Sequence, residues 1–143
     1  MPIRTRRYGD AGAPDDGYRV LVTRYRPRGV RREDETWDAW WPNLGPSIAL
    51  HADAYGKRGP AIAWDEYKAR YLEEIASQTW WIRGLAERVA AGETITLLCS
   101  SACADESRCH RSLLRVVIER AVSEASVSRE EPKSGATVVR RRR

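Results

Sequence analysis

Reactive side chains gather in one short segment of this 143-residue sequence. The segment holds several thiols, the last of which is followed by an imidazole and a guanidinium: Cys99, Cys103, Cys109, His110 and Arg111. A thiol can act as a nucleophile, an imidazole as an acid or base, and a guanidinium as an anion ligand. Thiols and imidazoles also bind metal ions, and a cysteine can simply pack in a core, so several kinds of site remain open.

The segment starts where a strand is predicted to end and finishes where a helix is predicted to begin. Residues 94–100 (TITLLCS) are apolar on both alternating faces, as expected for a strand buried in a parallel sheet. Residues 110–125 carry an apolar stripe at helical spacing. Ligands of open α/β sheets bind at the carboxyl edge, against helix N-termini. We therefore expect Cys109, His110 and Arg111 to lie in a crevice at that edge.

The other elements complete an α/β pattern. Apolar periodicity and turn residues predict strands at 19–23 and 136–139, a short helix capped by Ser47, helices at 63–77 and 79–93, and a short helical turn before Pro42. The order strand, helices, strand, helix, strand predicts a single small α/β domain with a short, mostly parallel open sheet flanked by helices. We assign this domain to residues 1–128 and a basic C-terminal segment to residues 129–143.

Composition narrows the class of protein. Hydrophobic residues make up 42% of the chain and six tryptophans are present, which indicates a globular rather than a disordered protein. No apolar run approaches the roughly 20 residues of a membrane helix, and the basic N-terminus lacks the apolar core of a secretory signal. Three cysteines in one segment make a poor disulfide framework. We therefore expect a cytoplasmic protein that does not enter a membrane.

Charge is distributed unevenly along the chain. The net charge is +5, and residues 129–143 hold six basic and two acidic residues, so the remainder is nearly neutral. A second concentration of arginines lies within residues 4–32. If both ends fold to the same side they form a basic face, and exposed Trp40 or Trp41 would stack on bases. A nucleic-acid-binding accessory protein is therefore one hypothesis.

An anion pocket is the first hypothesis for the Cys-His-Arg sequence. The planar guanidinium of Arg111 and the backbone N–H groups of a helix N-terminus both bind phosphate or carboxylate. Arg24 and Arg28 follow the first predicted strand and would join this pocket if the two strands are parallel and adjacent. The alternative for Arg111 is an ion pair with Asp105 or Glu106.

Cys109 is a candidate nucleophile or redox thiol, with His110 as acid or base. Neighbouring cations and a helix N-terminus lower the pKa of a thiol and so favour this role. The alternative is a small, buried and inert thiol. Cys99 is expected to pack inside the sheet, and Cys103 and Cys109 could form a reversible disulfide across the loop.

Zinc binding is the third hypothesis. The possible ligands are spaced Cys99-x3-Cys103-x5-Cys109-His110, without a CxxC pair, and two adjacent residues would both have to bind the ion. We therefore assign no metal ligands and keep a zinc-stabilised interaction module as an alternative. His51 is expected to be a surface or capping residue. No Walker loop, GxGxxG, HExxH or GxSxG motif is present, so the sequence names no cofactor.

Four stretches occur in an order that resembles the YeaO-like family, domain of unknown function 488. They are DDGYRVLVTRYRPRG, NLGPSIAL, WDEYKARYLEEI, and TLLCS followed by CHRSLL, and the resemblance spans residues 4–122. Residues 24–29 match the family's Arg-x-Trp-Pro-Arg-Gly loop, with Arg26 in place of the tryptophan. Residues 45–47 match its Ala-Pro-Ser turn, with glycine for alanine, and residues 67–71 match its aromatic-x-x-Arg-Tyr element. One branch of the family also carries the Cys-His-Arg sequence.

The resemblance implies a compact α/β fold and a candidate pocket, and it supplies no reaction because the family's activity is unassigned. The residues it leads us to expect in the pocket are Arg24, Arg28, Ser47, Arg70, Tyr71, Cys109, His110 and Arg111. Their cations, hydroxyls and thiol suit an anionic small molecule such as a nucleotide or a phosphorylated metabolite. We predict a small cytoplasmic enzyme or enzyme-like binder, in which Cys109 and His110 are catalytic and the other six residues bind the anion.

Overall fold

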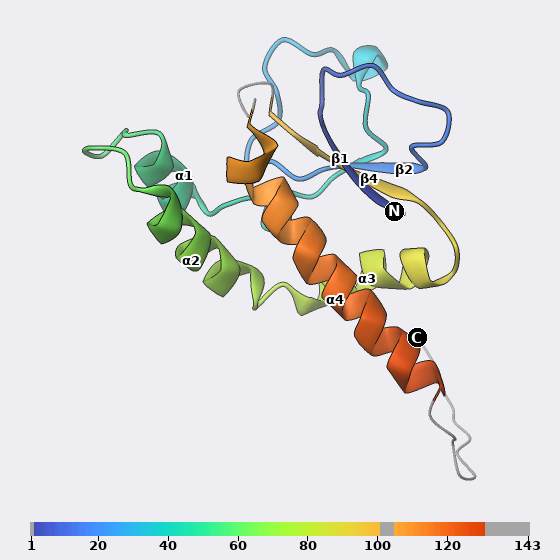
Figure 1. The fold of residues 1–143 in the computed structure, drawn as a ribbon. Helices are drawn as coiled ribbons and strands as arrows, with labels where there is room; N and C mark the ends of the chain where they lie inside the picture. The colour runs from blue at the N-terminus through green and yellow to red at the C-terminus, as the bar shows by residue number, and fades with distance from the viewer. Residues whose placement is uncertain (1, 101–104, 131–143) are drawn as a thin grey trace.

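A four-stranded parallel sheet organises the structure (Figure 1). The computed structural model describes residues 2–100 and 105–130. The strands, in the spatial order β1-β4-β2-β3 with every pair parallel, are β1 (Ile3–Arg7), β2 (Tyr18–Leu21), β3 (Ala39–Trp40) and β4 (Ile95–Cys99). The prediction of a single small α/β domain with a mostly parallel sheet is confirmed.

β4 lies in the middle of the sheet. It pairs with β1 on one side and β2 on the other, so that Ile95 lies opposite both Ile3 and Tyr18. All five residues of β4 are buried, as their unbroken apolar run predicts. Because the strands are parallel, their carboxyl ends meet at one edge, and Cys99 ends β4 at that edge.

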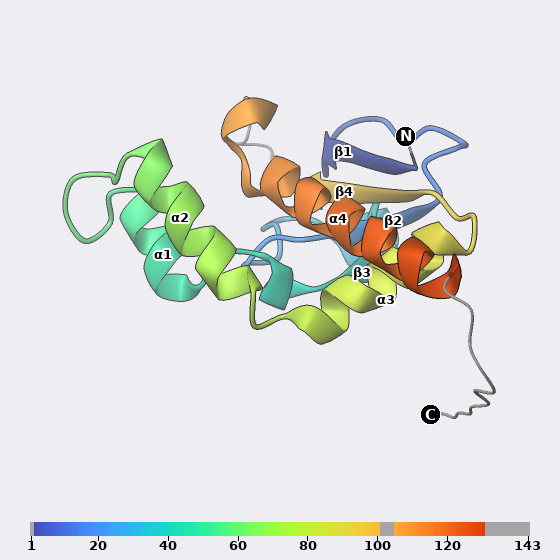
Figure 2. The same ribbon diagram turned by 60° about the horizontal axis from the view of Figure 1, so that its bottom comes forward.

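Of the helices in the described residues, two pack on one face of the sheet and two lie beyond it. They are α1 (Ile48–Ala54), α2 (Trp64–Ile75), α3 (Thr79–Ala90) and α4 (His110–Glu130). Figure 2 shows α3 and α4 side by side against one face of the sheet, with α1 and α2 paired beyond the sheet. α4 contacts β1 and β4 as well as α2 and α3. This helix therefore connects the sheet to the pair formed by α1 and α2.

The two faces of the sheet are covered differently. On the face that carries the helices, strand and helix side chains form one large buried cluster that includes Val20, Leu85, Leu97, Leu114 and Ile118. On the other face, Leu21 and Leu98 pack against Trp37, which belongs to the long segment between β2 and β3. The strands are thus buried on both sides although helices cover only one side.

Two strands at the sheet margins were not predicted. β1 is basic (IRTRR) with Ile3 alone fully buried, and β3 has two residues, so neither shows a strand pattern. The helical turn expected before Pro42 is wrong, because β3 occupies this stretch and a 3-10 turn, Pro42–Leu44, follows it. Ser47 caps α1 as predicted, its Oγ accepting a hydrogen bond from the Leu50 N–H at 3.1 Å.

The predicted strand at residues 136–139 lies outside the described residues, so the assignment of a separate segment at 129–143 stays a prediction. α4 ends at Glu130. Within residues 2–100 and 105–130, no helix combines the length and the apolar character that crossing a bilayer requires.

Candidate functional site

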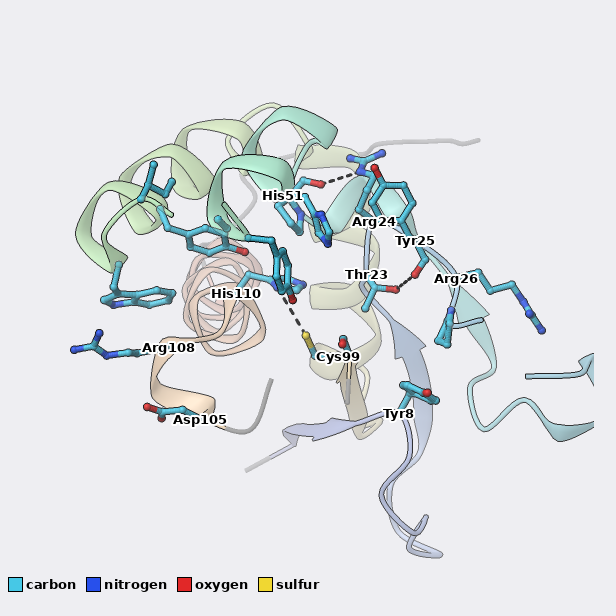
Figure 3. Close-up of a pocket in the computed structure, with 18 of the residues that line it drawn as sticks. Tyr8, Thr23, Arg24, Tyr25, Arg26, His51, Cys99, Asp105, Arg108 and His110 are labelled. Carbon is cyan, nitrogen blue, oxygen red and sulfur yellow. Dashed lines mark hydrogen bonds between the residues drawn. The ribbon is translucent and has the colours of Figure 1, made fainter. Parts of the chain in front are cut away.

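A cavity of about 600 Å³ opens at the carboxyl edge of the sheet (Figure 3). Its lining comes from the segments that follow β1, β2 and β4, from α1 and α2, and from the start of α4. This is the edge at which the sequence predicted a crevice, and the volume is in the range of small-molecule sites. The cavity is therefore the candidate functional site.

A buried cluster of two cysteines and a histidine lies at one wall of the cavity. The Sγ atoms of Cys99 and Cys109 are 3.2 Å apart, and Nδ1 of His110 is 3.9 Å from the first and 4.0 Å from the second. Cys99 and His110 line the cavity, whereas Cys109 is not part of its lining. Of the two thiols in the described residues, Cys99 thus borders the cavity, although its place at the end of a buried strand predicts packing inside the sheet. Cys103 lies outside the described residues.

Hydrogen bonding fixes the orientation of the His110 ring. Its Nε2 lies 2.6 Å from the carbonyl oxygen of Val22, and a carbonyl can only accept, so Nε2 carries the proton of the neutral ring. Nδ1 then presents its lone pair to the two sulfur atoms. The ring of Tyr71 packs against the imidazole with the centroids 5.4 Å apart. His110 is therefore held with its acceptor nitrogen facing both thiols.

Within the described residues, four arginines line the cavity, and they differ in what they bind. Arg24 donates from Nε to a backbone carbonyl at 2.8 Å, and Arg26 pairs with Glu35. Arg28 and Arg108 are exposed, and no hydrogen bond or ion pair joins their side chains to the part of the chain that the structure describes. These two are the cations that a bound anion can reach without breaking a protein contact.

Aromatic rings form another wall of the cavity. Trp64 and Tyr67 of α2 stack with their centroids 5.4 Å apart, and both line the cavity. Tyr71, one turn further along α2, is parallel to Tyr67 at 6.3 Å and is fully buried. One aromatic stripe thus runs from the cavity wall into the core. Its outer rings offer flat faces on which a nucleobase or another planar group can stack.

Two of the predicted anion ligands lie outside the cavity lining and join its helices. The Ser47 hydroxyl donates a hydrogen bond to Glu74 at 2.5 Å, which ties the start of α1 to α2. Arg70 of α2 pairs with Asp53 of α1 at 2.9 Å. Hydrogen bonds from Arg58 and Arg70 lower the pKa of Asp53 to about 2. The structure gives both predicted ligands a role in holding the cavity wall.

Tyr71 also lies outside the cavity lining. Its buried hydroxyl donates to the carbonyl oxygen of Leu44 at 2.7 Å, and burial raises the pKa of the phenol well above its usual value. Tyr71→Phe should therefore lower the free energy of unfolding by about 1–2 kcal/mol, because the buried carbonyl loses its partner. Urea denaturation measures this loss, and the exposed Tyr25→Phe is the matched control. Equal stability of the two variants would contradict the buried hydrogen bond.

Arg111 is buried in the first turn of α4 and is not part of the cavity lining. Its Nε and Nη1 have no hydrogen-bond partner among residues 2–100 and 105–130. The pKa of Asp10 is lowered chiefly by a hydrogen bond from the backbone of Arg7 and, to a lesser degree, by the charge of Arg111. The predicted ion pairs of Arg111 with Asp105 or Glu106 do not form. Arg111 thus keeps buried donors available behind the cavity edge.

The arginines near the start of the chain are mostly paired with acids. Ion pairs join Arg4 to Asp15 and Asp16, Arg6 and Arg19 to Asp16, Arg7 to Asp10, and Arg31 to Glu33 and Asp34. Within the described residues, this pairing neutralises much of the basic face on which the nucleic-acid hypothesis rests. The basic residues 140–143 lie outside the described part of the chain.

Sequence reasoning missed several residues of the cavity. The sequence did offer a reason to expect Cys99 at the site, because this residue ends a predicted strand at the ligand-binding edge of the sheet. It offered one for Arg108 as well, since that residue directly precedes the Cys-His-Arg sequence. It offered none for Trp64 and Tyr67, because aromatic residues at helical spacing indicate core packing as readily as a cavity wall.

Comparison with known proteins places the chain in a family. Residues 3–122 match the family described as the active DUF488-N3 subclade. The chain belongs to this DUF488 family. Every residue that lines the cavity of this DUF488 protein falls within the matched range. The expected YeaO-like relationship is confirmed.

Two relatives of this DUF488 protein show the extent of the similarity. The uncharacterized protein YeaO of Escherichia coli (strain K12) is 32% identical over 101 residues, which cover 71% of this chain and 84% of YeaO. An uncharacterized protein of Mycobacterium tuberculosis (strain H37Rv) is 36% identical over 73 residues, which cover 51% of this chain and 59% of that protein. No solved structure matches the chain.

Proposed function

We propose that this DUF488 protein is a small enzyme, or an enzyme-like binder, that takes an anionic small molecule into the cavity at the carboxyl edge of the sheet. The proposed ligand is a nucleotide or another phosphorylated metabolite. The proposal depends on one observation: a single cavity of about 600 Å³ is lined both by aromatic rings and by two guanidinium groups, Arg28 and Arg108, that form no ion pair within the described residues. Guanidinium groups bind phosphate, and aromatic rings stack on a base.

Positive charge outweighs negative charge along the cavity. Its described lining holds four arginines, and Asp105 is the one carboxylate in it. Arg28 and Arg108 belong to different segments, the loop after β2 and the turn before α4, so an elongated ligand can meet one cation with its phosphate and leave the other for a second polar group. Arg111 adds a buried positive charge nearby. Apolar walls concentrate this field and favour anions.

The reactive part of the proposal is the cysteine and histidine cluster. We keep Cys109 and His110 as proposed catalytic residues and add Cys99, because Cys99 and His110 border the cavity directly. A ligand that fills the cavity comes to rest against these two side chains. A reducing cytoplasm, which we propose as the location, would keep the sulfur atoms available as thiols.

Single substitutions of the two unpaired cavity arginines test the proposal. We expect a nucleoside monophosphate to bind the wild-type protein at least about tenfold more tightly than the uncharged nucleoside, as measured by titration calorimetry. Arg28→Ala and Arg108→Ala should each weaken binding of the monophosphate by about tenfold, because each removes a hydrogen bond to a charged group worth about 1.5 kcal/mol. Neither side chain makes a hydrogen bond or an ion pair within the described residues, so both variants should fold normally.

Arg120→Ala is the matched control, because Arg120 is an exposed arginine of α4 and does not line the cavity. It should bind the monophosphate as the wild type does. Equal affinity of all three variants would contradict the proposal. A single-stranded oligonucleotide that binds more tightly than the monophosphate, with a steep dependence on salt, would instead support the nucleic-acid hypothesis.

A further inference from the structure

The cysteine and histidine cluster also has the composition of a metal site. Its three ligand atoms, two Sγ and one Nδ1, all lie within 4.8 Å of one another. We propose that Cys99, Cys109 and His110 bind one zinc ion through these atoms. This inference goes beyond the proposed function, because zinc binding needs no organic ligand in the cavity. With zinc bound, the three side chains would be metal ligands in place of a free nucleophile and base.

The interatomic distances fit one small cation. Zinc lies about 2.3 Å from thiolate sulfur and about 2.0 Å from imidazole nitrogen, so tetrahedral ligands are separated by roughly 3.5–3.8 Å. In the cluster, the separations are 3.2 Å between Cys99 Sγ and Cys109 Sγ, and 3.9 and 4.0 Å from these atoms to His110 Nδ1. Shifts of about half an ångström, within the reach of small side-chain rotations, bring all three to bonding distance.

The histidine is oriented as a metal ligand requires. A histidine that binds zinc through one ring nitrogen commonly donates the other N–H to a backbone carbonyl or a carboxylate, which fixes the ring and its tautomer. Nε2 of His110 makes this contact with the carbonyl oxygen of Val22 at 2.6 Å. The opposite nitrogen, Nδ1, faces the sulfur atoms. Figure 3 shows His110 turned toward Cys99 at the cavity wall.

Backbone conformation removes the objection that neighbouring residues cannot both be ligands. Cys109 is extended, with φ −131° and ψ 144°, and the helix begins at the next residue, His110. The chain therefore turns between them, and the side chains of both residues face Cys99. The sequence spacing alone did not reveal this turn, and for that reason we assigned no metal ligands from the sequence.

Burial strengthens the site. Cys99, Cys109 and His110 are 1%, 2% and 5% exposed, so little water competes for the ion. Binding converts both thiols to thiolates, with their protons released to solvent, and the two negative charges neutralise Zn²⁺. The bound ion would border the cavity through Cys99 and His110.

Metal analysis of the full chain tests the site. The protein is purified under reducing conditions without a metal-affinity step, and zinc is measured by mass spectrometry against protein concentration. We expect one zinc per chain, retained against a weak chelator and lost from Cys99→Ser, Cys109→Ser and His110→Gln. The matched control is His51→Gln, because His51 is the other histidine and lines the same cavity outside the cluster. This variant should retain its zinc.

Cobalt provides a measurement that does not depend on the variants folding. Wild-type protein stripped of metal and titrated with Co²⁺ should develop the absorption of thiolate-to-cobalt charge transfer and saturate at one equivalent, with no nucleotide present. Less than a tenth of an equivalent of zinc together with no charge-transfer band would overturn the site. So would an intact mass lower by two hydrogens, because any disulfide among Cys99, Cys103 and Cys109 includes at least one of the two cysteine ligands. Failure of nucleotide binding would leave both measurements unchanged.

Discussion

Asp16→Asn should lower the free energy of unfolding by about 3 kcal/mol, because it removes the negative member of a buried ion-pair cluster. The side chain of Asp16 is 2% exposed and accepts hydrogen bonds from Arg4 at 3.3 Å, from Arg6 at 3.2 Å and from Arg19. Arg19 is 11% exposed, so its charge would stay largely buried without a counter-ion. The cluster links the turn before β2 to β1.

The effect should depend on pH. Burial raises the pKa of Asp16, but the N–H of Ala13 and the charges of Arg6 and Arg19 lower it by more, so the pKa is below its usual value in the folded protein. A lowered folded pKa gives stability that is present above about pH 4 and is lost as the pH falls through that folded value. The difference between wild type and Asp16→Asn in urea denaturation should therefore be full at neutral pH and shrink below about pH 4.

Asp15→Asn is the control for this prediction. Asp15 also pairs with Arg4, at 2.6 Å, but its side chain is 69% exposed. Water replaces the lost partner there, so the substitution should change stability little. If Asp15→Asn and Asp16→Asn had equal effects, burial would not be the source of the stabilisation.

Gly17→Ala should destabilise the protein by about 3 kcal/mol or more, because two penalties coincide at this turn. Gly17 has φ +68°, a conformation that residues with a side chain rarely adopt. An added Cβ would lie 2.0 Å from the carbonyl oxygen of Thr94, which also accepts the hydrogen bond from the Tyr18 N–H at 3.0 Å. The start of β2 would have to move away from β4. Thermal unfolding measures the loss.

Two other glycines separate these penalties. Gly29 has φ +77° but nothing within 4 Å of an added Cβ, so Gly29→Ala should show only the conformational cost of about 1 kcal/mol. Gly9 has neither feature, and Gly9→Ala should be close to neutral. The account requires the order Gly17, Gly29, Gly9 from the largest loss to the smallest. A loss at Gly17 no larger than the loss at Gly29 would mean that the close approach to Thr94 does not control the turn.

The elements predicted correctly are those whose own residues show a pattern of buried apolar side chains. β4 is an unbroken apolar run, and α2, α3 and α4 each carry an apolar stripe at helical spacing. β1 was not predicted because its basic residues hide the strand pattern: Arg4 and Arg6 pair with Asp16, which lies beyond the strand in sequence. β3 was not predicted because a strand of two residues is too short to show an alternation of apolar and polar residues. Contacts between distant segments, rather than local pattern, define both marginal strands.

The candidate site could likewise be predicted only in part from the sequence. Its location followed from topology, since a strand-to-helix transition in a parallel sheet lies at the ligand-binding edge. The identity of its members followed only in part, since the predicted Arg24, Arg28 and His110 line the cavity and the other predicted residues do not. Ser47 and Arg70 have the side chains of anion ligands, yet they bind Glu74 and Asp53 and hold α1 against α2. Cys109 meets Cys99, with their Sγ atoms 3.2 Å apart, only because the end of β4 and the start of α4 lie side by side in the fold.

A crystal structure of the protein grown with a nucleoside monophosphate tests the central claim most directly. The account predicts the ligand in the cavity, with its phosphate within hydrogen-bond distance of Arg28 or Arg108 and its base against Trp64 or Tyr67. Ligand bound elsewhere on the protein, with the cavity empty at saturating concentration, would contradict it.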